Sequence, residues 1–128
     1  NELIKSIIKN KDNIKKISTI VHPEIRKDLQ KFTKKNIKNK VIILDIPLYL
    51  ENRLNKKKDV VIFIQSSRKE VLKRIKKRKN YNKLVLQRLK KLQLPLKRKK
   101  KKSHFVIKNN FDENFARKKV QNILDKIL

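Results

Sequence analysis

The sequence predicts an α/β fold in which a parallel sheet is flanked by helices. Two runs rich in β-branched residues, at 40–46 and 59–65, follow one another with no hairpin turn between them, and a third short run lies at 103–110. Amphipathic patterns with helical spacing precede and follow these runs. Continuous apolar strands that alternate with helices are typical of parallel sheets covered on both faces.

The N-terminal part of the chain is predicted to be helical. Apolar residues recur at helical spacing from Leu3 to Ile17, and we expect this amphipathic helix to break near Asp12. A further helix is predicted to begin at Pro23, because a proline in the first turn of a helix loses no hydrogen bond. Its apolar residues then share one face, and we expect it to end near Asn36.

Three strands are predicted. The run KVIILDI, residues 40–46, is expected to be the central strand, and Pro47 ends it because proline cannot donate a hydrogen bond to the ladder. The run DVVIFIQ, residues 59–65, repeats this buried character. The run SHFVIKNN, residues 103–110, predicts the third and shortest strand.

The remaining helices follow the second and third strands. Ser66 or Ser67 is the expected N-cap of a helix through RKEVLKRIKKR, and residues 81–94 predict another helix. The stretch LPLKRKKKK is expected to be a very basic loop. A closing helix is predicted at the C-terminus, with Asp112 or Asn110 as its cap.

The composition is strongly basic. Lys and Arg number 39 against 11 Asp and Glu, which gives a formal net charge of +28 and invites a nucleic-acid partner. However, Lys, Ile and Asn together make up 61 of the 128 residues, a bias that follows AT-rich codons. We therefore attribute most of the charge to base composition. No run approaches the ~18 apolar residues of a membrane span, and we expect no membrane partner.

Four residue types are absent: Cys, Gly, Met and Trp. Without cysteine the chain has neither a disulfide nor a thiolate metal site. Average usage of about 7% would give roughly nine glycines in a chain of this length. Because an initiator methionine is also missing, we expect the sequence to be a fragment.

Five segments occur in a characteristic order: HPEIR, LDIPLYLEN, DVVIFIQSSRKEVLKRIKKR, LQLP and HFVIKNN. Over residues 17–127 they resemble the C-terminal two thirds of dephospho-coenzyme A kinase, a P-loop kinase of the nucleoside-monophosphate-kinase type. The resemblance implies a partial P-loop kinase three-layer fold. Residues 1–128 would then be the C-terminal part of a single kinase domain, with a helical acceptor-side segment at about 1–40 and a lid at about 78–102.

This resemblance implies a function and its partners. ATP, with Mg²⁺, would phosphorylate the ribose 3′-hydroxyl of dephospho-CoA in the cytoplasm, which is the last step of coenzyme A biosynthesis. The family's Gly-rich phosphate loop and its catalytic Asp would precede the residues shown. Since a chain without glycine cannot form that loop, we expect the fragment to be inactive alone.

The resemblance also implies an ATP side. Arg74 and Arg78 are one helical turn apart, so their forked guanidinium groups could grip a polyphosphate, which lysine matches less well. Lys99 falls closest to the family's lid lysine, Gln93 matches its lid glutamine, and Asn109 lies in its last-strand ending. The alternative for the arginines is a solvated basic helix.

The acceptor side is assigned by resemblance to His22, Pro47, Leu48 and Glu51. His22 could instead be a local capping or packing residue, and Glu51 could be favoured by a helix dipole in a first turn. Asp45, near the end of the first predicted strand, could orient a hydrated Mg²⁺, since this ion keeps several waters. An ordinary turn residue at the end of a strand is the equal alternative.

Two other functions remain open on the sequence. One is a small basic RNA-binding or ribosome-associated protein, for which the run at 97–102 is the best feature, although no aromatic residues interleave it. The other is a nucleotide kinase with a different acceptor. His104 and Lys108 stand where the resembled family often has Asp, and we expect His104 to be structural. The oligomeric state is not predicted.

Overall fold

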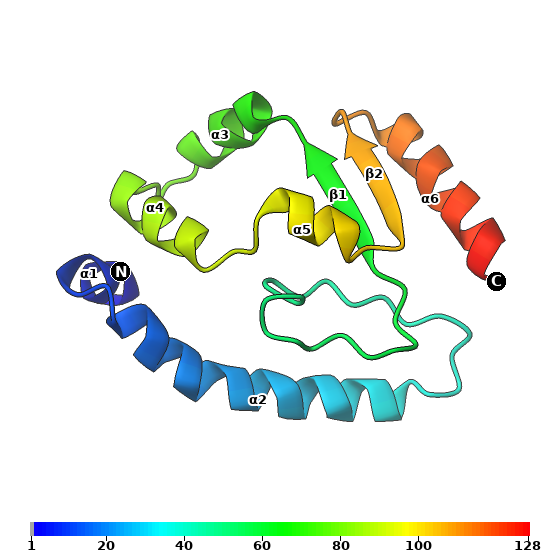
Figure 1. The fold of residues 1–128 in the computed structure, drawn as a ribbon, viewed down its shortest axis with the longest axis horizontal. Helices are drawn as coiled ribbons and strands as arrows, with labels where there is room; N and C mark the ends of the chain where they lie inside the picture. Colours follow the sequence, from blue (N-terminus) through cyan, green and yellow to red (C-terminus); the bar gives the residue numbers. More distant parts are fainter. Residues whose placement is uncertain (1) are drawn as a thin grey trace. The chain divides into compact units, whose positions relative to one another are not determined.

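The computed structural model describes residues 2–128, and six helices and two strands lie among them (Figure 1). In chain order these are α1 (Glu2–Lys9), α2 (Asn13–Lys35), β1 (Ile62–Ser66), α3 (Arg68–Lys76), α4 (Lys83–Lys91), α5 (Leu96–Lys101), β2 (Phe105–Asn109) and α6 (Glu113–Ile127).

The chain divides into two compact units. Unit 1 comprises Asn1–Leu54 and Lys83–Gln93, and it contains α1, α2 and α4. Unit 2 comprises Asn55–Asn82 and Leu94–Leu128, and it contains the two strands with α3, α5 and α6. The chain therefore enters each unit twice.

Unit 2 is built on a parallel pair of strands, as the sequence predicts. β1 pairs with β2 in a register that runs from Ile62 opposite Phe105 to Ser66 opposite Asn109. Both arrows point the same way in Figure 1, and α6 packs beside β2. The observed α/β architecture with a parallel sheet and flanking helices confirms the predicted fold class.

For α3 and α6 of unit 2 the sequence offers two candidate N-caps each, and the structure shows which residue caps the helix. The Ser67 hydroxyl accepts a hydrogen bond from the N–H of Glu70 (3.2 Å), so Ser67 and not Ser66 caps α3. The Asp112 carboxylate accepts from the N–H of Phe115 (2.7 Å), so Asp112 caps α6. Each side chain satisfies a donor that the first helical turn leaves unpaired.

Unit 1 is held together by its helices. α1 packs against α2 and α4, and Ile14 is the buried apolar residue of α2. Arg88 of α4 donates from Nη1 to the carbonyl oxygens of Ile7 and Ile8, the latter at 3.2 Å. These carbonyls belong to the last turn of α1, where a cation is favoured by the helix dipole.

The prediction of a helix start at Pro23 is wrong. Pro23 lies inside α2, which continues without interruption from Asn13 to Lys35. The proline removes a single helical hydrogen bond, while residues on both sides keep theirs, and a helix of this length tolerates the loss as a local defect. The break near Asp12 is confirmed, since α1 and α2 are separate helices, and α2 ends next to Asn36 as expected.

The central strand predicted over 40–46 is also wrong. The structure assigns no strand there, and Ile43 is 81% exposed. A β-strand exists only through hydrogen bonds to a neighbouring strand. Within the described residues the sheet consists of β1 and β2 alone, so this apolar run stays an unpaired segment.

The predicted basic loop is largely helical, which is a third correction. Residues 96–101 form α5, after Pro95 at the N-cap position. Leu, Lys and Arg are good helix formers, and no β-branched residue or glycine interrupts them. The hydroxyl of Ser103 donates to the carbonyl oxygen of Lys99 (2.8 Å) and so satisfies one acceptor of the last turn.

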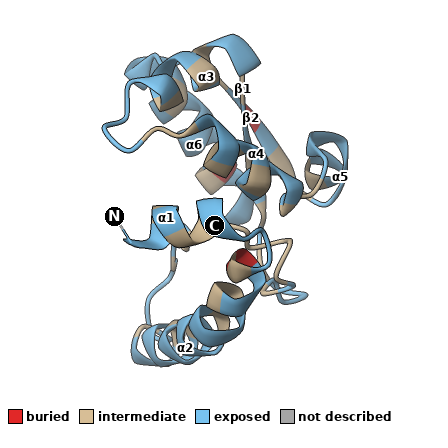
Figure 2. Ribbon diagram, turned by 90° about the vertical axis from the view of Figure 1, so that its left-hand side faces the viewer, coloured by how far each residue is buried: buried red, intermediate tan, exposed pale blue. Residues whose placement is uncertain are grey.

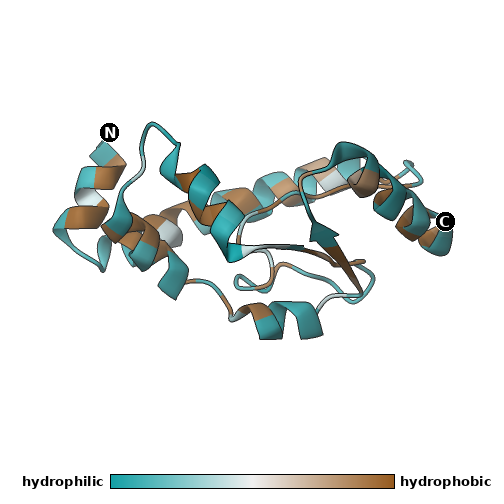
Figure 3. Cartoon of the chain, turned by 90° about the horizontal axis from the view of Figure 1, so that it is seen from above, coloured by the Kyte–Doolittle hydropathy of each residue, from teal (hydrophilic) through white to brown (hydrophobic). Residues whose placement is uncertain are grey.

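The apolar core is small. Within residues 2–128 the buried apolar side chains are Ile14, Ile107 and Ile123, and pale blue predominates in Figure 2. Figure 3 shows hydrophobic stripes on the helices, parts of which stay exposed. Since hydrophobic stabilisation grows with the apolar area removed from water, its contribution to folding is modest in this structure.

Candidate functional site

A tight turn follows the apolar run in unit 1. The N–H of Asn52 donates to the carbonyl oxygen of Leu48 (2.9 Å), and the N–H of Leu54 donates to that of Tyr49 (3.1 Å). Leu48 (φ 57°) and Arg53 (φ 51°) adopt the left-handed conformation that favours glycine. This turn carries three of the residues that the sequence assigns to the acceptor side: Pro47, Leu48 and Glu51.

Helix α2 reaches this turn through an arginine. Nη2 of Arg26 donates to the carbonyl oxygen of Asn52 (3.4 Å). His22 lies one helical turn before Arg26 and is half-buried. Arg26 is not among the residues predicted from the sequence, although its spacing of four residues from His22 within HPEIR indicates a shared helix face.

A surface hollow surrounds Pro23 on the same face of α2. It has a volume of about 230 Å³ and is lined by Ser18, Thr19, His22, Pro23 and Arg26. Because proline has no N–H, the carbonyl oxygen of Thr19 receives no hydrogen bond from residue 23. The hollow therefore combines a backbone acceptor, an imidazole and a guanidinium, which are groups that suit a polar ligand.

The two acceptor-side carboxylates differ in exposure. Glu51 is half-buried within the turn, whereas Asp45 is exposed two residues before Pro47. No group of three or more His, Asp or Glu side chains that could hold a metal ion occurs in residues 2–128. Asp45 is therefore a single exposed carboxylate that belongs to no such group.

The carboxyl ends of the parallel strands lie together in unit 2. Ser66 ends β1 and Asn109 ends β2, and these two residues are paired in the register. Ser67 then begins α3 as its cap, so the positive end of a helix dipole lies next to the end of the sheet. Open α/β sheets bind their ligands at this edge.

Arg74 is brought to this edge by an aromatic contact. Its guanidinium carbon lies 3.9 Å from the centroid of the Phe111 ring. The N–H of Phe111 donates to Oδ1 of Asn109 (2.8 Å). The structure thus brings together two residues that the sequence assigns to ATP, Arg74 and Asn109, through Phe111, which the sequence analysis missed.

The other residues assigned to ATP lie in the segments that follow. Arg78 is exposed in the turn after α3, and its N–H donates to the carbonyl oxygen of Ile75 (3.1 Å). Lys99 is half-buried in α5. Gln93, the lid glutamine of the resemblance, lies two residues after α4 and belongs to unit 1.

His104 has a structural contact, as the sequence analysis expects. Its Nδ1 accepts a hydrogen bond from the N–H of Val61 (3.0 Å), and its own N–H donates to the carbonyl oxygen of Val61 (2.8 Å). Nδ1 thus supplies the kind of acceptor that an Asp carboxylate would supply. These bonds join the residues just before β1 and β2.

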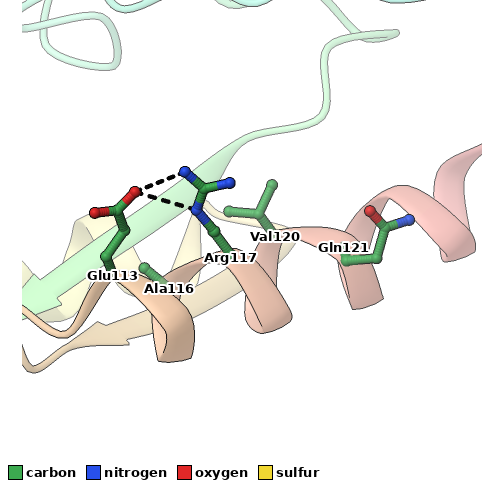
Figure 4. Close-up of a pocket in the computed structure, with 5 residues that line it drawn as sticks. All are labelled: Glu113, Ala116, Arg117, Val120 and Gln121. Atoms are coloured by element: carbon green, nitrogen blue, oxygen red, sulfur yellow. Dashed lines mark hydrogen bonds and ion pairs between the residues drawn. The ribbon is translucent and has the colours of Figure 1, made fainter.

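A second surface hollow, on α6, involves none of the assigned residues. It has a volume of about 430 Å³ and is lined only by side chains of α6: Glu113, Ala116, Arg117, Val120 and Gln121 (Figure 4). One oxygen of Glu113 accepts from Nη2 (2.7 Å) and Nε (3.1 Å) of Arg117. This exposed ion pair satisfies both charges, so the hollow has little left to offer a ligand.

The assigned residues divide cleanly between the units. The four ATP-side residues, Arg74, Arg78, Lys99 and Asn109, all belong to unit 2. The residues assigned to the acceptor and to Mg²⁺, namely His22, Pro47, Leu48, Glu51 and Asp45, all belong to unit 1. The residues predicted to bind ATP and those predicted to bind the acceptor therefore lie in different units.

No helix within residues 2–128 has the length and apolar character needed to cross a lipid bilayer.

Comparisons with known proteins agree on one family. Residues 1–114 match the family model described as dephospho-CoA kinase. The dephospho-CoA kinase of Wolbachia sp. subsp. Brugia malayi (strain TRS) is 30% identical over 118 residues, which cover 91% of this chain and 60% of the relative. That of Fusobacterium nucleatum is 31% identical over 121 residues, with coverage of 94% and 62%. The chain thus spans about three fifths of the length of these curated relatives.

Proposed function

Because this chain belongs to the dephospho-CoA kinase family, we propose that it supplies the lid side and the acceptor side of an enzyme that phosphorylates dephospho-CoA with ATP. The ribose 3′-hydroxyl oxygen attacks the γ-phosphorus, the bond from that phosphorus to the β–γ bridging oxygen breaks, and ADP leaves. The hydroxyl proton passes to a base. The products are coenzyme A and ADP.

The observation that carries this proposal is the cluster at the carboxyl ends of β1 and β2. Arg74, in the last turn of α3, lies over the ring of Phe111, and the N–H of Phe111 is held by Asn109 at the end of β2. Phosphoryl transfer needs positioned cations around the transferring group more than it needs covalent chemistry from the protein. We propose that Arg74, Arg78 and Lys99 supply such cations.

We propose that the turn at 47–53 and the adjacent face of α2 hold the acceptor. His22 and Arg26 line one hollow, and Arg26 is anchored to the turn through the carbonyl oxygen of Asn52. Leu48 and Pro47 would contact the apolar parts of dephospho-CoA, and Glu51 would accept hydrogen bonds from its hydroxyl groups. A forked guanidinium suits the pyrophosphate of the acceptor.

A magnesium ion fits this chain only in part. Mg²⁺ in kinase sites is held by one or two carboxylates together with substrate phosphates and water, and Asp45 is a single exposed carboxylate. We propose that Asp45 contacts the hydrated ion through water. When bound, the ion neutralises charge on the phosphates. We place the reaction in the cytoplasm, where ATP is supplied.

We propose that the Gly-rich phosphate loop and the base lie outside these 128 residues. The chain contains no glycine, and that loop requires backbone conformations and a close approach to phosphate that favour glycine. The 128 residues alone are therefore expected to be inactive. Family membership favours this function over a small basic RNA-binding protein.

The test is ATP-dependent formation of coenzyme A. We would assay residues 1–128 alone, and a chimera in which they replace the corresponding three fifths of the Fusobacterium nucleatum relative. The account expects no turnover by the chain alone and turnover by the chimera with dephospho-CoA as the preferred acceptor. Turnover by the chain alone would contradict the glycine argument, and faster transfer to a nucleoside monophosphate would overturn the proposed acceptor.

A further inference from the structure

Phe111 occupies a backbone conformation that does not suit it. Its φ of 65° lies in the left-handed region, where a β-carbon crowds the backbone and glycine is favoured. The residue is also 36% exposed, so its ring is no anchor of the core. Neither local propensity nor burial therefore explains a phenylalanine at this position.

Two contacts hold the ring in place. Oδ1 of Asn109 accepts the N–H of Phe111 at 2.8 Å, which fixes the backbone directly after β2. The ring then lies 3.9 Å from the guanidinium carbon of Arg74 on α3. The gain from an exposed cation–π contact is of the same order as the cost of a left-handed residue, so the pair adds little net stability. Its effect is to fix geometry.

The stack restricts Arg74 in a useful way. The ring, 3.9 Å from the guanidinium carbon, covers one side of this group and limits its rotation, while the N–H donors that do not face the ring stay uncovered. No carboxylate or carbonyl pairs with these donors in the part of the chain that the structure describes. The charged, forked N–H donors of Arg74 that do not face the Phe111 ring suit the oxygens of a polyphosphate.

We propose that Phe111 is a positioning residue: its ring holds the guanidinium of Arg74 at the carboxyl edge of the sheet so that Arg74 binds the phosphates of ATP. This inference rests on the proposed function and extends it to a residue that neither the motifs nor the comparisons assign. Phe111 acts through Arg74 and does not itself contact the nucleotide.

Binding tests this role in the full 128-residue chain. Dissociation constants for ATP, sodium tripolyphosphate and adenosine would be measured by titration calorimetry at about 0.15 M salt, where long-range attraction to the +28 chain is screened. The variants are F111L, which keeps apolar bulk and the left-handed backbone but removes the ring, F111Y, which keeps the ring, R74A, and the double variant. R117A, on α6, is the matched control for the loss of one exposed positive charge.

We expect F111L and R74A each to weaken ATP and tripolyphosphate binding by roughly threefold to tenfold, the range that a cation–π contact and a charged hydrogen bond represent. The double variant should bind no more weakly than R74A, and F111Y and R117A should bind as the wild type does. Because F111L keeps the left-handed backbone and loses the contact, its melting temperature should fall, but no further than that of R74A, which loses the same contact. Additive losses, wild-type affinity in F111L, or a melting temperature of F111L below that of R74A would each overturn the positioning role.

A second reporter observes the stack directly. The chain has no tryptophan, so F111W introduces a single indole against Arg74. Tripolyphosphate should change its emission, and the change should disappear when R74A is added. A response to adenosine alone would overturn the assignment to phosphate. The proposed function can fail without the positioning role. If ATP binding depends on Phe111 but the chimera transfers no phosphate to dephospho-CoA, the proposed acceptor is wrong and the positioning role is unaffected.

Discussion

The imidazole Nδ1 of His104 accepts the backbone N–H of Val61 at 3.0 Å, and so joins the segments that lead into the two parallel strands. The N–H of His104 donates in return to the carbonyl oxygen of Val61 (2.8 Å). A side chain and a backbone group of one residue therefore fix the point at which the register of β1 against β2 begins.

Replacement of this acceptor should weaken unit 2. We predict that His104→Leu lowers the free energy of unfolding by about 1 kcal/mol, because the N–H of Val61 loses its partner. His104→Asp, which keeps an acceptor oxygen, should lose less. Urea denaturation followed by circular dichroism measures the difference, and equal losses in the two variants would contradict a role for the Nδ1 acceptor.

Arg88 should stabilise α1 through its last turn. Its Nη1 donates to the carbonyl oxygens of Ile7 and Ile8, and we predict that Arg88→Ala costs about 1–2 kcal/mol of local stability. Amide hydrogen exchange in Glu2–Lys9 measures this loss. Lys91→Ala, an exposed change on the same helix, is the control and should leave the exchange rates unchanged. Unchanged protection in Arg88→Ala would contradict the cap.

Arg53 offers a test of backbone strain within the turn at 47–53. Its φ of 51° is left-handed, a conformation that Asn adopts more readily than Arg. We predict that Arg53→Asn raises the free energy of unfolding by a few tenths to about 1 kcal/mol. Thermal denaturation measures it, with Arg117→Asn as a control at a helical position where the same change should stabilise nothing.

The correctly predicted parts of the fold are those that depend on residues close together in the sequence. Ser67 and Asp112 cap helices because a short polar side chain at that position satisfies free N–H groups, and this needs no information from distant residues. The parallel pairing of β1 with β2 also follows from two apolar runs with helices between them. The break before α2 follows from the sequence in the same way.

The three wrong predictions have different causes. The run at 40–46 has the residues of a buried strand, but a strand is made by its neighbours, and no described strand pairs with it. Pro23 suits a helix start, yet the residues before it extend α2 through the proline. The lysines of 96–101 suggested a loop by charge, while their helix propensity prevailed.

The sequence predicted which residues belong to the candidate site, but it did not predict the contacts between them. Resemblance to a family supplied Arg74 and Asn109, but the contact that joins them is made by Phe111, whose role depends on a left-handed backbone that no motif encodes. Arg26 was overlooked for a similar reason, since its partner is a backbone carbonyl 26 residues away.

The division of the assigned residues between two units leads to the most direct test. In the active chimera, the KM for ATP and the KM for dephospho-CoA would be measured for Arg78→Ala of unit 2 and His22→Ala of unit 1, with Arg117→Ala as the control. The account predicts that Arg78→Ala raises the KM for ATP roughly tenfold, the effect of one lost charge-assisted contact, and leaves that for dephospho-CoA unchanged. His22→Ala should raise only the KM for dephospho-CoA. Variants that raise both constants together, or the opposite constant, would contradict the assignment of ATP to unit 2 and the acceptor to unit 1.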